Sequence, residues 1–501
     1  MSPATIVRLW PRASQAVEGD PRYRLPRWLI QRGLGLVYLI AFLVAVNQFL
    51  PLTGEHGLLP VPTFVKQVPF HDAPSLFYLF PADWAFTVAA WLGVVLAALA
   101  VAGIADGYAT WLSMLVWTLL WLIYLSFVNV GQTFYAFGWE SMLLEASFYA
   151  IFLGSRKSAP RAIPIWLLRW MLFRVMFGAG LIKLRGDPCW RNFTCLDYYY
   201  ETQPMPNPLS WYFHWAPTWM HRAGVGFNHF VELAVPFAYF APQPIATIAG
   251  VVTIVFQSLL MLSGNLSFLN LLTIVLAFST LDGRLLAKFL PIRLPEFAPP
   301  GRVVRYGMAA LAALVGLLSI QPAVNMLSPG QLMNFNYNPL HLVNTYGAFG
   351  SINRTRYEVV VEGTADASPG DTTQWREYEF RAKPGDLSRT PPQIAPYHLR
   401  LDWLMWFAAM SRYEQEPWFV NFMGKLLQGD RQVLGLLRTN PFPDHPPRYV
   451  RAQLYLYRFT TPAERKASGN WWHRELVGLW FPEVSLDTPG FRRFLLEQGW
   501  L

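Results

Sequence analysis

Seven ionisable residues lie inside apolar runs that are long enough to be membrane helices, and their types could do acid–base chemistry. They are Glu140, Glu145, Arg169, Arg174, Lys183, His229 and Glu232. An ionisable side chain inside a membrane helix is energetically costly and usually faces the interior of a helix bundle. This set therefore predicts either ion pairs that lock helices together or a polar cavity that opens to one side.

The depth of each group along its helix predicts which of them can meet. Glu145 and Glu232 lie about 12 Å below the outer ends of their helices, and Arg174 lies about 15 Å below. Glu140 and Lys183 lie within about 5 Å of the outer interface. We therefore expect a Glu145–Arg174–Glu232 network and a shallower Glu140–Lys183 pair.

Helical geometry limits how many of these groups one cavity can hold. Arg174 and Lys183 differ by about 180° around an ideal helix, so they face opposite sides unless the helix is central or broken. His229 and Glu232 are three residues apart and share a face. Two roles of this polar cluster therefore stay open: it either locks the helices together or lines a cavity that opens outward.

The composition places these groups in a membrane. Of the 501 residues, 53% are hydrophobic and only 14% are charged, whereas a soluble protein carries about a quarter charged residues. A membrane helix needs about 20 apolar residues. Nine segments are expected to be such helices, at 33–50, 84–104, 109–130, 137–154, 164–184, 224–241, 243–263, 266–281 and 306–322.

The distribution of Arg and Lys between the helices predicts their orientation. The segments on the side of the N-terminus hold six, three and five basic residues, fourteen in all, whereas the loops on the opposite side hold four. This bias follows the positive-inside rule. We expect a cytoplasmic segment at 1–32, a membrane domain at 33–322 with an outer loop at 185–223, and a non-cytoplasmic soluble domain at 323–501.

The soluble domain is expected to be of the α+β class and rich in strands. Alternating polar and apolar residues predict strands at 357–363, 375–381 and 453–459. Apolar runs predict short helices at 401–410 and 418–427. The fold class is therefore a polytopic α-helical membrane protein with a C-terminal soluble α+β domain.

Several smaller motifs predict structural roles. Cys189 and Cys195 lie in the outer loop, where an oxidising compartment permits a disulfide, the alternative being two free thiols. A single Cys-x5-Cys lacks the four ligands of a structural zinc site, so no metal is expected. His398 and Asp402, four residues apart at the start of a predicted helix, are expected to be a capping or surface pair.

The chain lacks the motifs of several common functional classes. The net charge of +9 arises from Arg and Lys beside hydrophobic segments, where they orient helices, and no nucleic-acid partner is expected. The motifs G-x-S-x-G, H-E-x-x-H and the P-loop are missing from the sequence. Residues 198–219 are rich in Tyr, Trp and Pro, which predicts either an aromatic belt against membrane lipids or a platform for a client protein.

From residue 137 onward, the sequence resembles the lipase maturation factor family. The resemblance rests on FGWESMLLE (137–145), GAGLIKLRGD (178–187), CWR (189–191), YETQPMPNP (200–208), SGNLSFLN (263–270), YEF (378–380), KPGD (383–386), PYH (396–398), RLDWLMWFAA (400–409), NPF (440–442) and GW (499–500). It implies a multi-pass protein that needs no cofactor and assists the folding and assembly of secreted lipases or other exported proteins. Its location would be the endoplasmic reticulum membrane in animals, or the inner membrane in a bacterium.

A second resemblance supplies an alternative function. The membrane part is distantly similar to vitamin K-dependent gamma-carboxylase, in which the lysine of an Ala-Gly-x-x-Lys-Leu segment is proposed as the catalytic base. Lys183 occupies the matching position. A membrane-embedded enzyme that acts on a lipid, a quinone or a nascent protein is therefore the alternative, with Lys183 as a general base. A transporter ranks third, because no inverted repeat is visible.

Overall fold

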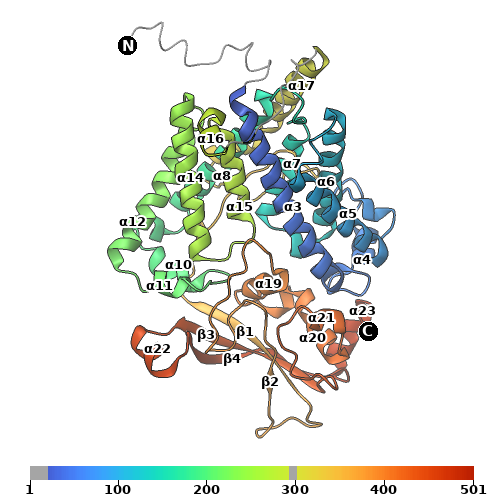
Figure 1. The fold of residues 1–501 in the computed structure, drawn as a ribbon. Coiled ribbons are helices and arrows are strands. Elements are labelled where there is room, and N and C mark those ends of the chain that lie inside the picture. Colours follow the sequence, from blue (N-terminus) through green and yellow to red (C-terminus); the bar gives the residue numbers. More distant parts are fainter. Residues whose placement is uncertain (1–20, 291, 293–301) are drawn as a thin grey trace.

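The computed structural model describes residues 21–290, 292 and 302–501. It consists of a helix bundle and a C-terminal domain that contains a four-stranded sheet (Figure 1). Within these residues, six helices are long and apolar enough to cross a membrane, and a bent helix pair raises the number to at most seven. The six are α3 (Arg24–Thr53), α5 (Asp83–Ala102), α6 (Thr110–Val130), α8 (Ala162–Arg185), α14 (Gln243–Ser263) and α17 (Arg302–Leu318), which continues into α18 (Ile320–Leu327).

Three of the nine predicted membrane helices are shorter or broken in the structure. The segment 137–154 holds α7 (Gly138–Ala150), which has only 13 residues. The segment 224–241 is divided, and 266–281 belongs to a pair bent by 113°. The pieces are α12 (Thr218–His229), a π-helical turn (Phe230–Ala234), α13 (Val235–Ala238), α15 (Leu269–Ala277) and α16 (Gly283–Phe289). Nine spans are therefore not confirmed, because apolar length does not reveal where a helix breaks.

The short helix α7 is almost entirely buried and packs against α3, α6, α8 and α15. Eleven of its 13 residues are buried, and both of its glutamates are among them. In α5, by contrast, Trp84, Val88 and Trp91 are more than half exposed. An apolar surface of this kind suits contact with lipid chains.

An extended segment at residues 331–350 packs against the bundle before the chain reaches the sheet. The Asn344 backbone N–H donates to the Glu145 carboxylate at 3.0 Å, and the Gln331 amide donates to the Gly178 carbonyl at 3.0 Å. The sequence predicts a soluble domain from residue 323, but this segment lies on α7 and α8. Irregular backbone of this kind is tolerated at membrane depth only where protein buries it.

The C-terminal sheet is antiparallel, with the strand order β2-β1-β3-β4. Its strands are β1 (Arg356–Thr364), β2 (Arg376–Glu377), β3 (Tyr449–Phe459) and β4 (Trp472–Val484). The strands predicted at 357–363 and 453–459 lie within β1 and β3, whereas 375–381 yields only the two residues of β2. The strand β4 was not predicted, and Gly478 and Pro482 interrupt its apolar run.

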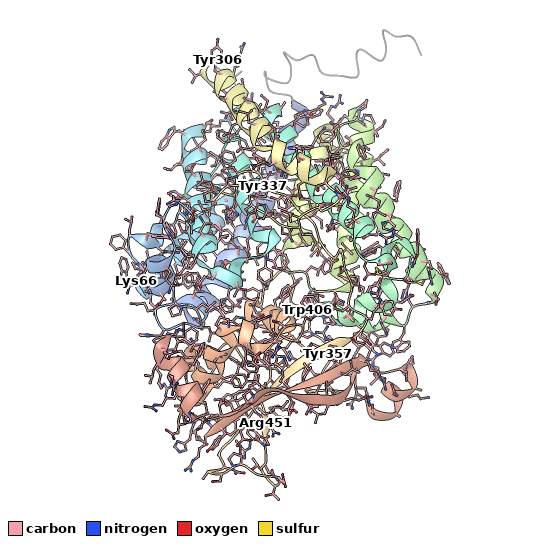
Figure 2. The ribbon with its side chains drawn as sticks, turned by 180° about the vertical axis from the view of Figure 1, so that it is seen from behind. Lys66, Tyr306, Tyr337, Tyr357, Trp406 and Arg451 are labelled. Carbon is pink, nitrogen blue, oxygen red and sulfur yellow. A yellow bond between two sulfur atoms is a disulfide. The ribbon has the colours of Figure 1, made fainter. Side chains whose placement is uncertain are left out.

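Short helices surround the sheet and connect it to the bundle. They are α19 (Arg400–Ala408), α20 (Pro417–Gln428), α21 (Arg431–Leu434), α22 (Pro462–Ser468) and α23 (Pro489–Glu497), and on the bundle side α4 (Val61–Gln67), α9 (Pro188–Arg191), α10 (Leu196–Thr202) and α11 (Ser210–His214). The helices predicted at 401–410 and 418–427 correspond to α19 and α20. Trp406 of α19 lies between the bundle and the sheet (Figure 2), where its indole N–H donates to the Thr202 carbonyl at 3.1 Å.

Replacing Gly178 by Ala should lower the melting temperature of the full-length protein in detergent. A Cβ at this position would lie 2.5 Å from the Tyr346 carbonyl oxygen, a backbone atom that cannot rotate away. Overpacking of this kind costs about 1–3 kcal/mol. The control is Gly307→Ala in α17, where an added Cβ meets nothing within 4 Å. Equal melting temperatures for Gly178→Ala and the unmodified chain would show that residues 331–350 do not pack closely on α8.

Candidate functional site

The first buried ion pair joins Glu145 on α7 to Arg174 on α8, with both side chains at most 1% exposed. Glu145 Oε1 also accepts a hydrogen bond from the Tyr149 hydroxyl at 2.8 Å. Its Oε2 accepts from the Tyr346 hydroxyl at 2.7 Å and from the Asn344 backbone N–H at 3.0 Å. One carboxylate thus holds two helices and the extended segment 331–350 together.

The second buried ion pair joins Lys183 near the end of α8 to Glu232 in the π-helical turn. Lys183 Nζ lies 2.6 Å from Glu232 Oε1 and donates to Asn228 Oδ1 at 3.0 Å. The Asn228 amide donates to Glu232 Oε2 at 2.9 Å, which closes a triangle of polar groups. Trp190 covers the ammonium with its ring at 4.9 Å, a cation–π contact.

This geometry bears on the chemistry that Lys183 could do. Nζ donates to two oxygen atoms, whereas a general base must accept a proton from its substrate. Single π-helical turns often occur at functional sites because they place a side chain where a regular helix would not. Here the turn directs Glu232 toward Lys183, so the arrangement fits an interhelical ion pair. The role of Lys183 as a base stays a prediction.

The third buried ion pair crosses from the bundle to the C-terminal domain. Arg400 at the start of α19 places Nη1 2.8 Å from Oε1 of Glu140 on α7. The Tyr124 hydroxyl donates to the other Glu140 oxygen, and Arg400 Nη1 also donates to the Phe134 carbonyl at 2.7 Å. The guanidinium lies 3.4 Å from the ring centre of Tyr135. Both charged side chains are fully buried, so each depends on the other for its charge compensation.

His398 lies beside this third pair in an aromatic pocket. Its Nδ1 is 3.8 Å from Glu140 Oε1, and its ring makes edge contacts with Phe137, Trp139 and Trp403. Burial and the positive charge of Arg400 together lower the pKa of His398 to about 4, against the opposing effect of Glu140. The pocket therefore holds a neutral imidazole at neutral pH.

The prediction of a capping or surface pair at His398 and Asp402 is wrong. Both residues are buried, and they point to different partners. Asp402 Oδ1 accepts hydrogen bonds from the backbone N–H groups of Ala382 at 2.6 Å and Lys383 at 3.0 Å. Burial raises the pKa of Asp402, and these two hydrogen bonds oppose that rise. Asp402 thus fixes a loop of the C-terminal domain, whereas His398 faces the bundle.

The observed ion pairs differ from the expected ones in two respects. Glu232 pairs with Lys183 rather than joining Glu145 and Arg174, and Glu140 pairs with Arg400 rather than with Lys183. The expected pairs followed from depth along each helix, and depth identifies neither the direction in which a neighbouring helix faces nor a partner from another domain. One signal in the sequence pointed to Arg400 as a functional residue: it begins the segment 400–409, which resembles the lipase maturation factor family.

Two of the predicted polar residues contact backbone carbonyl groups. His229 Nε2 lies 3.0 Å from the Trp190 carbonyl oxygen. Arg169 donates to the carbonyl oxygens of Ser279 at 2.9 Å and Tyr239 at 3.2 Å. The charged groups therefore pair in separate parts of the structure, and the outward cavity stays a prediction.

A fourth buried cluster, which the sequence analysis missed, ties the outer loop to the sheet. Arg356 and Lys383 both pair with Glu358, at 2.6 and 2.9 Å, and all three side chains are at most 2% exposed. Arg356 also donates to the backbone carbonyls of Glu201 and Pro204, both at 3.0 Å. The sequence does not reveal this cluster. Arg356 and Glu358 are two residues apart, which is the usual spacing of polar side chains on the solvent-facing side of a strand.

Amide side chains make further contacts between the bundle and the C-terminal domain. Asn265 Oδ1 accepts from the backbone N–H groups of Ile394 and Ala395, both at 2.8 Å, and its amide donates to the Pro392 carbonyl at 2.8 Å. Gln48 on α3 accepts from the Arg400 backbone N–H at 2.9 Å. Such amides satisfy backbone groups that would otherwise be buried without partners.

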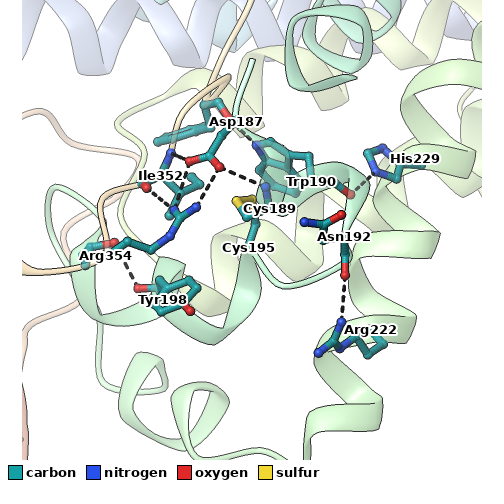
Figure 3. The surroundings of a disulfide bond; sticks show 12 residues. Asp187, Cys189, Trp190, Asn192, Cys195, Tyr198, Arg222, His229, Ile352 and Arg354 are labelled. Carbon is teal, nitrogen blue, oxygen red and sulfur yellow. Dashed lines mark hydrogen bonds and ion pairs between the residues drawn. A yellow bond between two sulfur atoms is a disulfide. The ribbon is translucent and has the colours of Figure 1, made fainter. Parts of the chain in front are cut away.

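The predicted disulfide between Cys189 and Cys195 is present and buried in the outer loop (Figure 3). Beside it, Arg354 pairs with Asp187 at 2.7 Å, and Asp187 also accepts from the Cys189 backbone N–H at 2.9 Å. The hydrogen bond from Arg354 holds the pKa of Asp187 below its usual value. The outer loop is thus joined to the segment that leads into β1.

The aromatic residues of the outer loop divide into two groups. Trp211 is buried, and its indole N–H donates to the Thr460 carbonyl at 2.8 Å. Tyr212 and Trp219 are more than half exposed. The exposed group is compatible with both expected roles, an aromatic belt and a client platform.

The fold and the buried pairs define a multi-pass membrane protein whose C-terminal domain is locked to its helices. The model of the lipase maturation factor transmembrane domain matches residues 25–288, and that of the lipase maturation factor C-terminal domain matches residues 342–482. The chain belongs to the lipase maturation factor family.

Curated relatives extend this similarity over almost the whole chain. Lipase maturation factor 1 of Bos taurus is 44% identical over 95% of this chain and 91% of its own length. Lipase maturation factor 1 of Homo sapiens is 42% identical over 98% and 93%, and lipase maturation factor 2 of Homo sapiens is 30% identical over 95% and 85%. No solved structure matches the chain.

Breaking the Glu140–Arg400 pair should destabilise the junction between the bundle and the C-terminal domain. Arg400→Met leaves the Glu140 carboxylate buried without its partner, which costs about 3–5 kcal/mol. Glu140→Gln combined with Arg400→Met should cost less than the two single changes together, because no charge is then left unpaired. Thermal unfolding of the full-length protein in detergent measures this double-mutant cycle.

The matched control for this cycle is Arg412→Met. Arg412 lies 3.5 Å from Glu414, but its side chain is 78% exposed, so its loss should change stability by no more than about 1 kcal/mol. If Arg400→Met had as small an effect as Arg412→Met, the pair would not hold the two domains together.

Proposed function

We propose that this chain acts as a maturation factor that assists the folding and assembly of secreted lipases in the membrane where it resides. The observation that carries the proposal is the similarity to relatives named lipase maturation factor 1, at 42–44% identity over more than nine tenths of both chains. The similarity covers 95% and 98% of this chain, and each of the two domains matches a model of the family.

The geometry supports a structural mode of action rather than chemistry on a bound substrate. In the four buried ionic clusters the charged groups contact one another, and three of the clusters join elements far apart in the sequence, through the contacts Glu145–Tyr346, Arg356–Glu201 and Glu140–Arg400. The bundle would anchor the protein, and the locked junction would hold the C-terminal domain in one orientation to the membrane. A client then meets a rigid surface, which lowers the entropy that is lost when it binds.

We propose that the N-terminus lies in the cytoplasm and that the C-terminal domain lies on the non-cytoplasmic side. This side is the lumen of the endoplasmic reticulum in a eukaryotic cell and the periplasm in a bacterium. The excess of Arg and Lys on the N-terminal side and the disulfide on the other side support this orientation.

Protease treatment of sealed membranes tests the orientation, with a tag fused after Leu501. In endoplasmic reticulum vesicles whose cytoplasmic face is outermost, the tag should survive protease until detergent opens the vesicles. Loss of the tag without detergent would place the C-terminal domain in the cytoplasm and would remove the oxidising environment from the disulfide.

Expression in mammalian cells that lack their own lipase maturation factor 1 tests the function. With a co-expressed secreted lipase, the chain should raise the activity per mass of lipase in the medium, because more lipase leaves the cell correctly folded. Arg400→Met should lose most of this gain, whereas Arg412→Met should keep it. An unchanged lipase activity, at equal membrane levels of the unmodified chain, would refute the proposed function.

A further inference from the structure

The strand β4 forms one edge of the C-terminal sheet and carries an exposed apolar stretch. Leu476, Val477 and Leu479 are 59%, 54% and 58% exposed, although they belong to a strand of 13 residues. Figure 1 places β4 on the side of the sheet away from the bundle. An exposed apolar stretch at the edge of a sheet is a typical site of strand pairing with another chain.

The free edge of β4 offers main-chain hydrogen bonds as well as apolar side chains. β4 pairs with β3 on one side, and no strand of the described residues pairs with its other side. The N–H and C=O groups along such an edge can accept an added strand. This geometry selects an extended peptide segment as the partner, in preference to a helix or a small molecule.

Two features of β4 limit the stretch that can pair. Gly478, at φ 158°, lies at an irregularity in the pairing with β3, where the strand twists locally. Pro482 has no N–H to donate, so pairing ends before it. The usable stretch therefore runs from Glu475 to Phe481, about 23 Å of strand at 3.3 Å per residue.

The charges around this stretch indicate the composition of its partner. Residues 476–482 contain no ionisable side chain, and exposed glutamates flank them at Glu475 and Glu483. A complementary segment would be apolar in its middle, with a basic residue at one or both ends. A single edge of this length buries far less than the 1,200 Å² or so of a stable complex. The partner is therefore a transient one.

We propose that the free edge of β4 binds an extended, apolar segment of a lipase that has not yet folded, as an added strand of the C-terminal sheet. This inference rests on the proposed function and names the surface through which it acts. In a folded lipase, apolar strands are already paired and buried, so the same edge has nothing left to bind. Release of the client then follows from its own folding.

Binding of a reduced, unfolded lipase to the purified full-length protein in detergent tests this inference. The variant carries Leu476→Lys and Leu479→Lys, which place two charges on the edge while leaving the buried face of β4 unchanged. Lysines at such positions oppose strand pairing, and the dissociation constant should rise about tenfold or more, the factor that corresponds to 1.4 kcal/mol. Leu496→Lys is the control, because Leu496 is 52% exposed but belongs to α23 rather than to the edge strand.

A photo-reactive amino acid at Val477 locates the contact directly. It should crosslink to the unfolded lipase and not to the same lipase after folding, and the crosslinked peptide should be an apolar segment. Unchanged affinity of the double-lysine variant, or equal crosslinking to folded lipase, would overturn the β4 assignment. A crosslink to a second copy of this chain as the main product would also overturn it.

The cell assay separates this failure from that of the proposed function. If the unmodified chain raises lipase activity and the double-lysine variant raises it equally, the maturation function stands and the β4 assignment falls. If the unmodified chain raises no lipase activity, the function itself fails, whatever β4 binds.

Discussion

A charge that leaves water must find a partner inside the protein, and this constraint shapes the whole molecule. Glu140 is fully buried where the bundle meets the C-terminal domain, and its charge would be very costly there without a partner. Its partner Arg400 comes from a domain that begins far along the chain. The bundle and the C-terminal domain therefore complete each other, and neither buries its charges satisfactorily without the other.

The same constraint explains why the helices that carry glutamates are short or broken. A long regular helix presents its side chains at fixed angles, and few of these angles meet a given partner. The 13 residues of α7 lie inside the bundle, where Glu140 and Glu145 reach partners in opposite directions. In the same way the π-helical turn brings Glu232 to Lys183.

The rigid junction fixes the position of the C-terminal domain, and the free edge of β4 offers a surface for binding another chain. Buried ion pairs and amide side chains hold the C-terminal domain in one position, whereas β4 leaves backbone groups unpaired on its outer side. A binding surface on a fixed platform loses little entropy when a partner arrives. The family assignment and this geometry together favour a protein that handles other chains over one that transforms a small substrate.

By itself, the sequence determined the membrane class of the protein, the approximate positions of its six long helices and two of its longer strands, the disulfide and the family. These follow from hydropathy, periodicity and motifs, which are local properties of the chain. Only the tertiary structure decided the partners of Glu140 and Glu232, the burial of His398, the path of residues 331–350 and the existence of β4. Each of these depends on contacts between distant segments, and a local pattern carries no information about which distant segment will supply the partner.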